Sequence, residues 1–222
     1  MGNITLEMIK NDPVVQQYMQ IGNTFIGHIG AIEHSIHHAE LTAKLCAEIL
    51  ESLGYSEREA ELGSIAGYLH DIGNLVNRYS HGLSGAIIAF QILLEKGMDP
   101  DEISIIMGAI GNHEEQAHGN AVNNVAAALI LADKSDVNRS RVRKHDLATF
   151  TPRDRVNFAV TDSQLLVDSE KRIITMQIQI DTEVCSVMEY FEIFLTKMLM
   201  SRRAAEFLGC EFALVINQNR LL

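Results

Sequence analysis

Four histidines and two aspartates stand out because their side chains are common metal ligands and because they recur between residues 34 and 133. They are His34, His70, Asp71, His81, His113 and Asp133. Imidazole and carboxylate ligands without a thiolate suit Fe, Mn, Zn or similar cations. For the adjacent pair His70 and Asp71 alone, an ordinary helix end with a histidine near the negative end of the dipole would be the simpler explanation. The four further residues favour a metal site.

Helices must position these side chains, and apolar residues at helical spacing predict them over residues 32–53, 56–69, 81–94, 100–113 and 125–131. Start signals support this pattern, including a capping box at Ser56 and Pro100 at a first helical position. A weaker amphipathic pattern precedes them over residues 13–25. Neighbouring side chains on a helix point about 100° apart, so His70 and Asp71 can serve one cation only where their helix ends. Gly73 favours such an end.

The pattern changes after residue 150. Alternating residues predict strands over residues 156–167 and 172–180, joined by a turn at residues 168–171, and a last strand over residues 211–216. An apolar stripe of Val187, Phe191, Phe194 and Met198 predicts a helix between them, and this stripe could form a homodimer face or pack within the chain. We therefore expect a mainly α fold, with a helical domain over residues 1–150 and a small C-terminal α+β extension over residues 151–222.

The spacing of four ligands resembles a known family. His34-(x)35-His70-Asp71-(x)61-Asp133 is similar to the signature of the HD-domain metal-dependent phosphohydrolases, and the similarity covers roughly residues 32–136. The surroundings of His81 and His113 resemble members that hold two metals, including diadenosine tetraphosphate hydrolases and the HD-GYP phosphodiesterases. The HD-GYP signature itself is absent, because Asn112 replaces one of its histidines and no Gly-Tyr-Pro follows His118 and Gly119.

This resemblance implies an HD-domain helical bundle with two divalent ions, Fe or Mn, with Zn, Ni or Mg as alternatives. It implies that His34, His70, Asp71 and Asp133 hold one ion, and that Asp71 bridges to a second ion held by His81 and His113. The implied activity is hydrolysis of a phosphoester or phosphoanhydride in a nucleotide-like or other small phosphorylated compound by a metal-activated hydroxide, with Asp71 catalytic. The alternative is a non-catalytic regulatory or partner-binding HD module with a structural metal site, although such degenerate members typically lose ligands and this chain keeps the core four.

A basic run follows the last candidate ligand. Lys134, Arg139, Arg141, Arg143 and Lys144 are five of only 18 cations. The arginine fork suits phosphate, so we expect Lys134, Arg139, Arg141 and Arg143 to bind substrate, with Lys134 also assisting catalysis because it adjoins Asp133. A solvated helix face would give the same pattern. His118 is a further candidate for substrate contact, whereas His37 and His38 are expected to be surface or packing residues, since position 38 is usually apolar in the family.

Composition excludes several classes of protein. The formal charge of −11 argues against an open surface for a nucleic acid polymer. The three cysteines are far apart and lack metal-binding spacing, which fits a reducing cytoplasm better than a disulfide framework. Charged residues near the N-terminus exclude a signal peptide there, and the longest apolar run, over residues 125–132, is far shorter than the ~20 residues that a bilayer requires. We therefore expect a cytoplasmic protein with a small phosphorylated substrate and no membrane partner.

Overall fold

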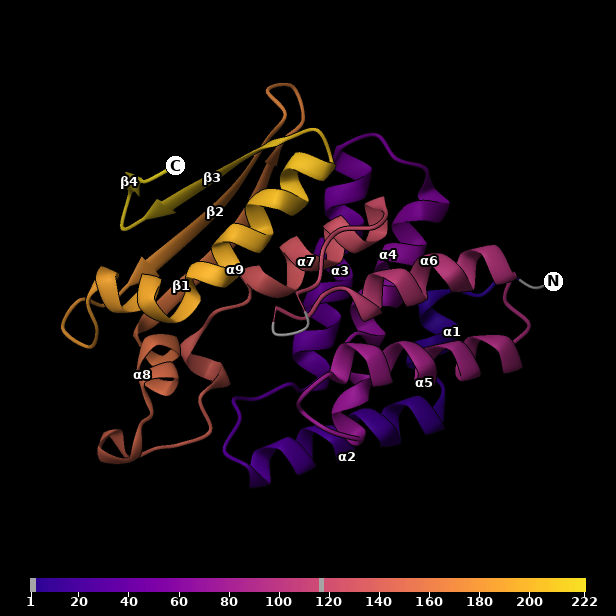
Figure 1. The fold of residues 1–222 in the computed structure, drawn as a ribbon, viewed down its shortest axis with the longest axis horizontal. Coiled ribbons are helices and arrows are strands. Elements are labelled where there is room, and N and C mark those ends of the chain that lie inside the picture. The colour runs from indigo at the N-terminus through magenta and orange to yellow at the C-terminus, as the bar shows by residue number, and fades with distance from the viewer. Residues whose placement is uncertain (1–2, 116–117) are drawn as a thin grey trace.

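The computed structural model describes residues 3–115 and 118–222, which form a helical bundle with a small sheet beside it (Figure 1). The helices are α1 (Leu6–Lys10), α2 (Pro13–His28), α3 (Ile36–Ser52), α4 (Glu57–Leu69), α5 (His81–Glu95), α6 (Pro100–Gly111), α7 (Asn124–Ser135), α8 (Pro152–Ala159) and α9 (Val187–Phe207). Short 3₁₀ helices lie at Ile72–Leu75, Arg139–Arg141 and Leu147–Thr149. None of the helices in the described residues combines the length and the apolar character that crossing a bilayer requires.

The helix ends follow the start signals of the sequence, with small shifts at the candidate ligands. Ser56 forms a full capping box at α4, and Pro100 is the first residue of α6. His34 does not lie inside a helix as expected, because Ser35 is the N-cap of α3 and His34 precedes it. Similarly, α6 ends at Gly111, two residues before His113. Both histidines therefore lie on irregular backbone.

Two glycines allow the ligand-bearing segments to approach closely. A Cβ atom at Gly67 of α4 would lie 2.8 Å from the backbone Cα and N atoms of Ala43 in α3. A Cβ atom at Gly73 would lie 1.9 Å from the carbonyl oxygen of His81. Gly73 is not among the glycines with a positive φ, so it does not end its helix through left-handed backbone as the sequence suggested. Its role is to let the segment after Asp71 lie against the start of α5.

The C-terminal extension contains a four-stranded sheet in the order β1 (Val160–Asp168), β2 (Ile173–Ile180), β3 (Glu211–Ile216) and β4 (Asn219–Arg220). The β1–β2 and β3–β4 pairs are antiparallel, whereas β2 and β3 are parallel and are connected through α9. The expected strand over residues 156–167 is wrong at its start, because residues up to Ala159 belong to α8. A capping box of Thr151 and Asp154, with Pro152 in the first turn, begins this helix.

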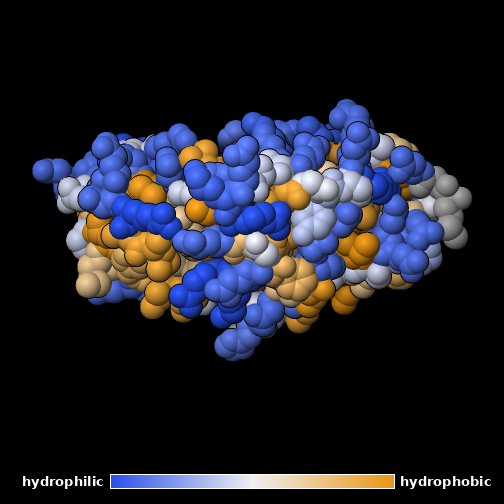
Figure 2. Space-filling model, turned by 90° about the horizontal axis from the view of Figure 1, so that it is seen from above, coloured by the Kyte–Doolittle hydropathy of each residue, from blue (hydrophilic) through white to orange (hydrophobic). Residues whose placement is uncertain are grey.

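The apolar stripe of α9 packs within the chain. Phe194 and Met198 are buried, and Val187 and Phe191 are partly buried against the core, while Figure 1 shows α9 between the sheet and the bundle. Leu195 of α9 is exposed and lines a surface groove together with Phe191 and Met198. Figure 2 shows that apolar residues form separate patches among hydrophilic residues on the face seen from above.

The close approach at Gly67 predicts a specific stability effect. We expect Gly67→Ala to destabilise the fold by about 1–3 kcal/mol, because the added methyl group meets backbone that cannot rotate away. Gly111→Ala is the matched control, since its Cβ atom would meet only the Ala86 Cβ atom at 3.8 Å, and it should be neutral or stabilise by up to about 1 kcal/mol. Urea unfolding measures both changes. Equal stability of the two variants would contradict the packing described for α3 and α4.

Candidate metal centre

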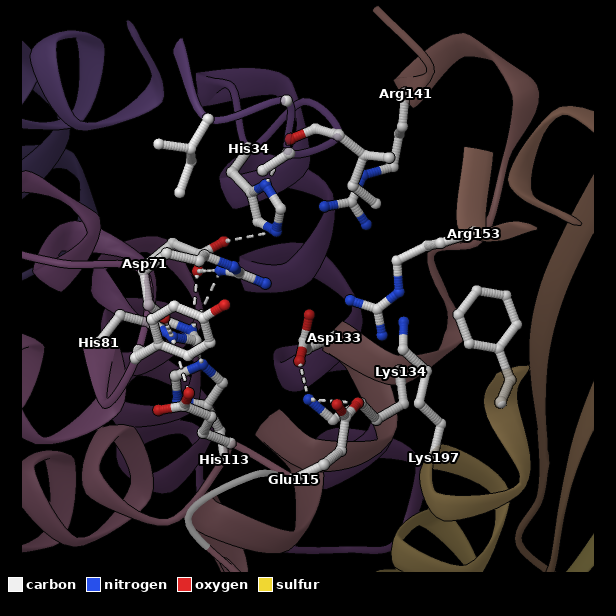
Figure 3. Close-up of a pocket in the computed structure, with 18 residues that line it drawn as sticks. His34, Asp71, His81, His113, Glu115, Asp133, Lys134, Arg141, Arg153 and Lys197 are labelled. Carbon is white, nitrogen blue, oxygen red and sulfur yellow. Dashed lines mark hydrogen bonds and ion pairs between the residues drawn. The ribbon is translucent and has the colours of Figure 1, made fainter. Parts of the chain in front are cut away.

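A cavity of about 230 Å³ opens where the bundle meets the extension, and the candidate ligands gather at one side of it (Figure 3). His34, Asp71, His81, His113 and Asp133 line the cavity directly. His70 is fully buried beside them. The six residues predicted from the sequence therefore converge, although they come from five separate segments of the chain.

Backbone carbonyl groups fix the orientation of the four predicted histidine ligands. The Nδ1 contacts are His34 with Ile32 O at 2.8 Å, His70 with Gly67 O at 2.7 Å, His81 with Arg78 O at 3.0 Å and His113 with Ile110 O at 2.6 Å. A carbonyl oxygen can only accept a hydrogen bond, so Nδ1 donates and carries the proton. The Nε2 atom of each neutral ring is therefore left with a free lone pair.

Three of these Nε2 atoms, together with that of a fifth histidine, His38, form two facing pairs. Nε2 of His38 lies 3.2 Å from Nε2 of His70, and Nε2 of His81 lies 3.1 Å from Nε2 of His113. Two acceptor nitrogens at this distance repel one another unless a proton or a metal cation lies between them. The geometry thus places lone pairs where a cation would relieve the repulsion.

Asp71 lies between the two pairs. Its Oδ2 atom is 3.1 Å from Nε2 of His70 and 4.0 Å from Nε2 of His34, and its Oδ1 atom is 3.2 Å from Nε2 of His81. Oδ2 is buried and has no hydrogen-bond partner among the described residues. A buried carboxylate oxygen without a partner is costly, and a divalent cation supplies the missing positive charge. The residues present therefore fit a divalent metal site.

His38 belongs to this centre, which corrects the expectation that it is a surface or packing residue. It is buried, and its Nε2 atom lies 3.4 Å from Oδ1 of Asp133. Its Nδ1 atom lies 2.6 Å from Oδ2 of Asp136, a carboxylate that fixes the ring in the same way as the carbonyl groups fix the others. The ligand atoms of His38, His70 and Asp133 lie within 4.8 Å of one another.

A usable signal for His38 was present in the sequence. His38 follows His34 by four residues and Asp136 follows Asp133 by three, which are the spacings of neighbours on one helix face. The apolar residue usual at position 38 in the family outweighed this signal.

Without a bound cation, the electrostatics of the cluster favour the protonation states of metal ligands at His34, His113, Asp71 and Asp133, but they favour the protonated ring at His70 and His81. Burial lowers the pKa of His34 and of His113 well below the usual value, so both rings are neutral. Burial alone would raise the pKa of Asp71 and Asp133, but His70 beside Asp71 and Lys134 beside Asp133 lower both well below their usual range. Burial would lower the pKa of His70, yet the two carboxylates outweigh it and raise that pKa to about 10. A bound cation would displace this proton.

The predicted substrate-binding residues divide into two groups. Lys134 and Arg141 line the cavity. Lys134 Nζ lies 2.5 Å from Oδ2 of Asp133 and 3.3 Å from Oε1 of Glu115. Arg141 donates to the carbonyl oxygens of Glu33 and Asp136 at 3.0 and 2.7 Å. Both cations therefore border the metal centre, with much of their donor capacity already used.

The other three candidates lie elsewhere, so their positions do not support the expected contact with substrate. Arg139 pairs with Asp181 at 3.8 Å and lies over the Phe158 ring. Arg143 donates to the carbonyl oxygen of Ala31 at 3.0 Å and to Asn23, where it holds the loop after α2. His118 is exposed and lines a separate depression. Arg139 and Arg141 lie at the two ends of the short 3₁₀ helix Arg139–Arg141 and reach different partners, Asp181 and the carbonyl oxygen of Glu33, so only part of the basic run borders the cavity.

Three cations of the cavity wall were missed by the sequence analysis: Arg78, Arg153 and Lys197. Arg78 follows the His-Asp pair and lies 3.6 Å from Oδ1 of Asp71. Arg153 and Lys197 come from α8 and α9 of the extension. No sequence motif connects them with the ligands, because only the tertiary packing of the extension brings them to the cavity.

The contact between His38 and Asp136 predicts the effect of a substitution outside the six predicted ligands. We expect Asp136→Asn to weaken metal affinity by about 10- to 100-fold, because a neutral amide holds the His38 ring less firmly than the carboxylate. Competition with a chromogenic chelator measures the affinity. Asp162→Asn, an exposed change on β1, is the control and should leave the affinity unaltered. If the Asp136→Asn protein binds metal as tightly as the unchanged chain, His38 is not part of the metal centre.

Comparison with known proteins agrees with this geometry. A family model described as "HD domain" matches residues 32–138, a segment that contains all six predicted ligands and His38. A relative from Methanocaldococcus jannaschii, named "Uncharacterized protein MJ1020", is 27% identical over 159 residues. The alignment covers 62% of this chain and 60% of the relative, so the chain spans less than two thirds of the length of this curated relative. Residues 32–138, which fold as a helical bundle around the His-Asp pair, are therefore identified as an HD domain.

Proposed function

We propose that the protein is a metal-dependent phosphohydrolase that acts on a small phosphorylated compound. The observation that carries this proposal is the arrangement of facing Nε2 atoms around the unpartnered Oδ2 atom of Asp71. Lone pairs and a carboxylate that converge in this way suit divalent cations, and HD domains are typically metal-dependent phosphohydrolases. The cavity beside the cluster provides room for a substrate.

The donor set supports two ions, as the resemblance implied. His38, His70 and Asp133 form one group whose ligand atoms lie within 4.8 Å of one another, and the Nε2 atoms of His81 and His113 form a separate pair 3.1 Å apart, with His81 3.2 Å from Oδ1 of Asp71. Asp71 turns one oxygen toward His70 and the other toward His81, which is the arrangement expected of a bridging carboxylate. The absence of thiolate among these ligands favours Fe or Mn, with Zn, Ni or Mg as alternatives.

Divalent cations held in this way lower the pKa of bound water and stabilise negative charge on phosphoryl oxygens. The residues of the chain contribute positioning. The Nδ1 hydrogen bonds hold each imidazole in place, Asn74 donates to Oδ1 of Asp71 at 2.9 Å, and Glu114 accepts from the backbone N–H groups of Ser80 and Gly82 at the start of α5. Lys134 and Arg141 add positive charge at the edge of the cluster, where the phosphate oxygens of a substrate would lie.

The alternative is a regulatory or partner-binding HD module in which the metal site is structural. The cavity argues against it, because charged side chains such as Lys134 and Arg153 line an open space beside the ligands. Structural metal sites typically lack such an open space, because their protein ligands close them.

Asp71→Asn tests the proposal, with elemental analysis of the purified protein and a screen of phosphorylated compounds as the two readouts. We expect one or two transition-metal ions per unchanged chain and a loss of at least about 10³-fold in turnover for the variant, because the bridging charge serves both ions. Asp162→Asn should keep both metal and activity. Full metal content without turnover of any phosphorylated compound would favour the regulatory module, and a chain that takes up no Mn, Fe or Zn on reconstitution would contradict the metal site itself.

A further inference from the structure

Two cations of the extension enter the cavity without a counter-charge. Arg153 of α8 and Lys197 of α9 line the cavity, and Figure 3 shows both head groups pointing into it from the side opposite Asp71, His81 and His113. Within residues 3–115 and 118–222, neither side chain forms an ion pair or a hydrogen bond. Their shared contact is the ring of Phe194, at 5.7 Å from Arg153 and 4.6 Å from Lys197.

The other cations of the cavity wall differ in this respect. Lys134 contacts Asp133 and Glu115, Arg141 contacts Asp136, and Arg78 contacts Asp71. These three have acidic partners and help to neutralise the carboxylates of the metal centre. Arg153 and Lys197 are therefore in excess of what the folded chain itself requires at this site.

The surroundings make the positive charges of this pair unfavourable without an anion. Burial lowers the pKa of Lys197 to about 8, and the attraction of Glu115 and Asp133 does not restore it, in part because Lys134 and Arg153 are also nearby. Burial likewise lowers the pKa of Arg153. Glu115 is the acid that acts most strongly on both, but Lys134 already contacts it. The cation–π contacts with Phe194 hold the two stems in place and supply no full negative charge.

We propose that Arg153 and Lys197 form a subsite for a second anionic group of the substrate, a phosphate or a carboxylate, apart from the phosphate that is hydrolysed. This inference rests on the proposed function. The guanidinium group of Arg153 and the ammonium group of Lys197 lie on the same wall of the cavity, and both can donate charge-assisted hydrogen bonds to one anion. The metal centre lies across the cavity from them, so one substrate would contact the metal centre through one anionic group and the extension through another.

The local structure of the extension is suited to this role. Arg153 lies in the first turn of α8, immediately after the capped start at Thr151 and Pro152. Lys197 follows Phe194 by three residues on α9, so both lie on the helix face that is turned toward the cavity. The extension thus contributes to substrate recognition.

Binding of three anions to the full chain, loaded with Mn²⁺ and freed of excess metal, tests the subsite. The probes are inorganic phosphate, pyrophosphate and phosphonoacetate, measured by calorimetry with the unchanged protein, Arg153→Gln and Lys197→Gln. Arg155→Gln on α8 and Arg202→Gln on α9 are matched controls, because both side chains are about half exposed, at 47% and 48%, and pair at the surface with Glu189 and Glu206. Metal content and circular dichroism check that each variant is folded and loaded.

We expect the unchanged protein to bind pyrophosphate more tightly than phosphate, and each cavity variant to lose about 10- to 100-fold in pyrophosphate affinity while phosphate affinity changes little. An equal loss for phosphonoacetate would show that a carboxylate can fill the subsite, and an unaffected phosphonoacetate would restrict it to phosphate. Pyrophosphate that binds no better than phosphate, or cavity variants that behave like the controls, would overturn the inference. Binding is measured without turnover, so the subsite would be supported even if no phosphorylated compound were hydrolysed. Conversely, if a phosphorylated compound is hydrolysed but the cavity variants keep the anion preference of the unchanged protein, the subsite is overturned and the proposed function is not.

Discussion

The hydrogen bonds from the histidine Nδ1 atoms are the constraint on which the rest of the site depends. Each bond ends on an acceptor that has no proton to give, either a backbone carbonyl group or the Asp136 carboxylate. The Nε2 lone pairs must therefore point inward, where they face one another around Asp71. These lone pairs and the Asp71 carboxylate require a positive charge between them. The helix ends and the close glycine contacts of the bundle hold the ligand residues in this arrangement.

Much of this centre could be predicted from the sequence because helix ends have local signals. The capped start at Ser56 and the start at Pro100 place His70, Asp71 and His113 near helix ends, and the spacing of the ligands indicates the family. The boundaries were less accurate, since His34 and His113 lie just outside their helices. In the extension, the capping box at Thr151 shows that a start signal was overlooked in favour of the strand pattern that follows it.

The rest of the site could not be predicted because it depends on tertiary packing. Arg153 and Lys197 are separated in sequence from the ligands by a change of secondary structure, and no periodicity connects them. Lys134 and Arg139 both belong to the basic run, yet one lies at the metal centre and the other pairs with Asp181 outside the cavity. The basic run is visible in the sequence, but only the path of the backbone shows which of its residues reach the cavity.

The cavity wall extends beyond the segment that matches the family model. Residues 32–138 supply the ligands, whereas Ile29, Arg141, Arg153 and Lys197 lie outside that segment and complete the wall. The ligands and the rest of the cavity wall thus come from different segments. Residues of the wall can change without changing the ligands, and in this way one fold can serve several substrates.

The most direct test of the central claim is a crystal structure of the metal-loaded protein with anomalous diffraction data collected at the absorption edge of the metal found by elemental analysis. We expect anomalous peaks in contact with Oδ2 of Asp71 and with inward-pointing Nε2 atoms, while the Nδ1 atoms keep their carbonyl and Asp136 partners. Peaks bound through Nδ1, or a cluster that keeps its facing nitrogens with no peak after loading, would contradict it.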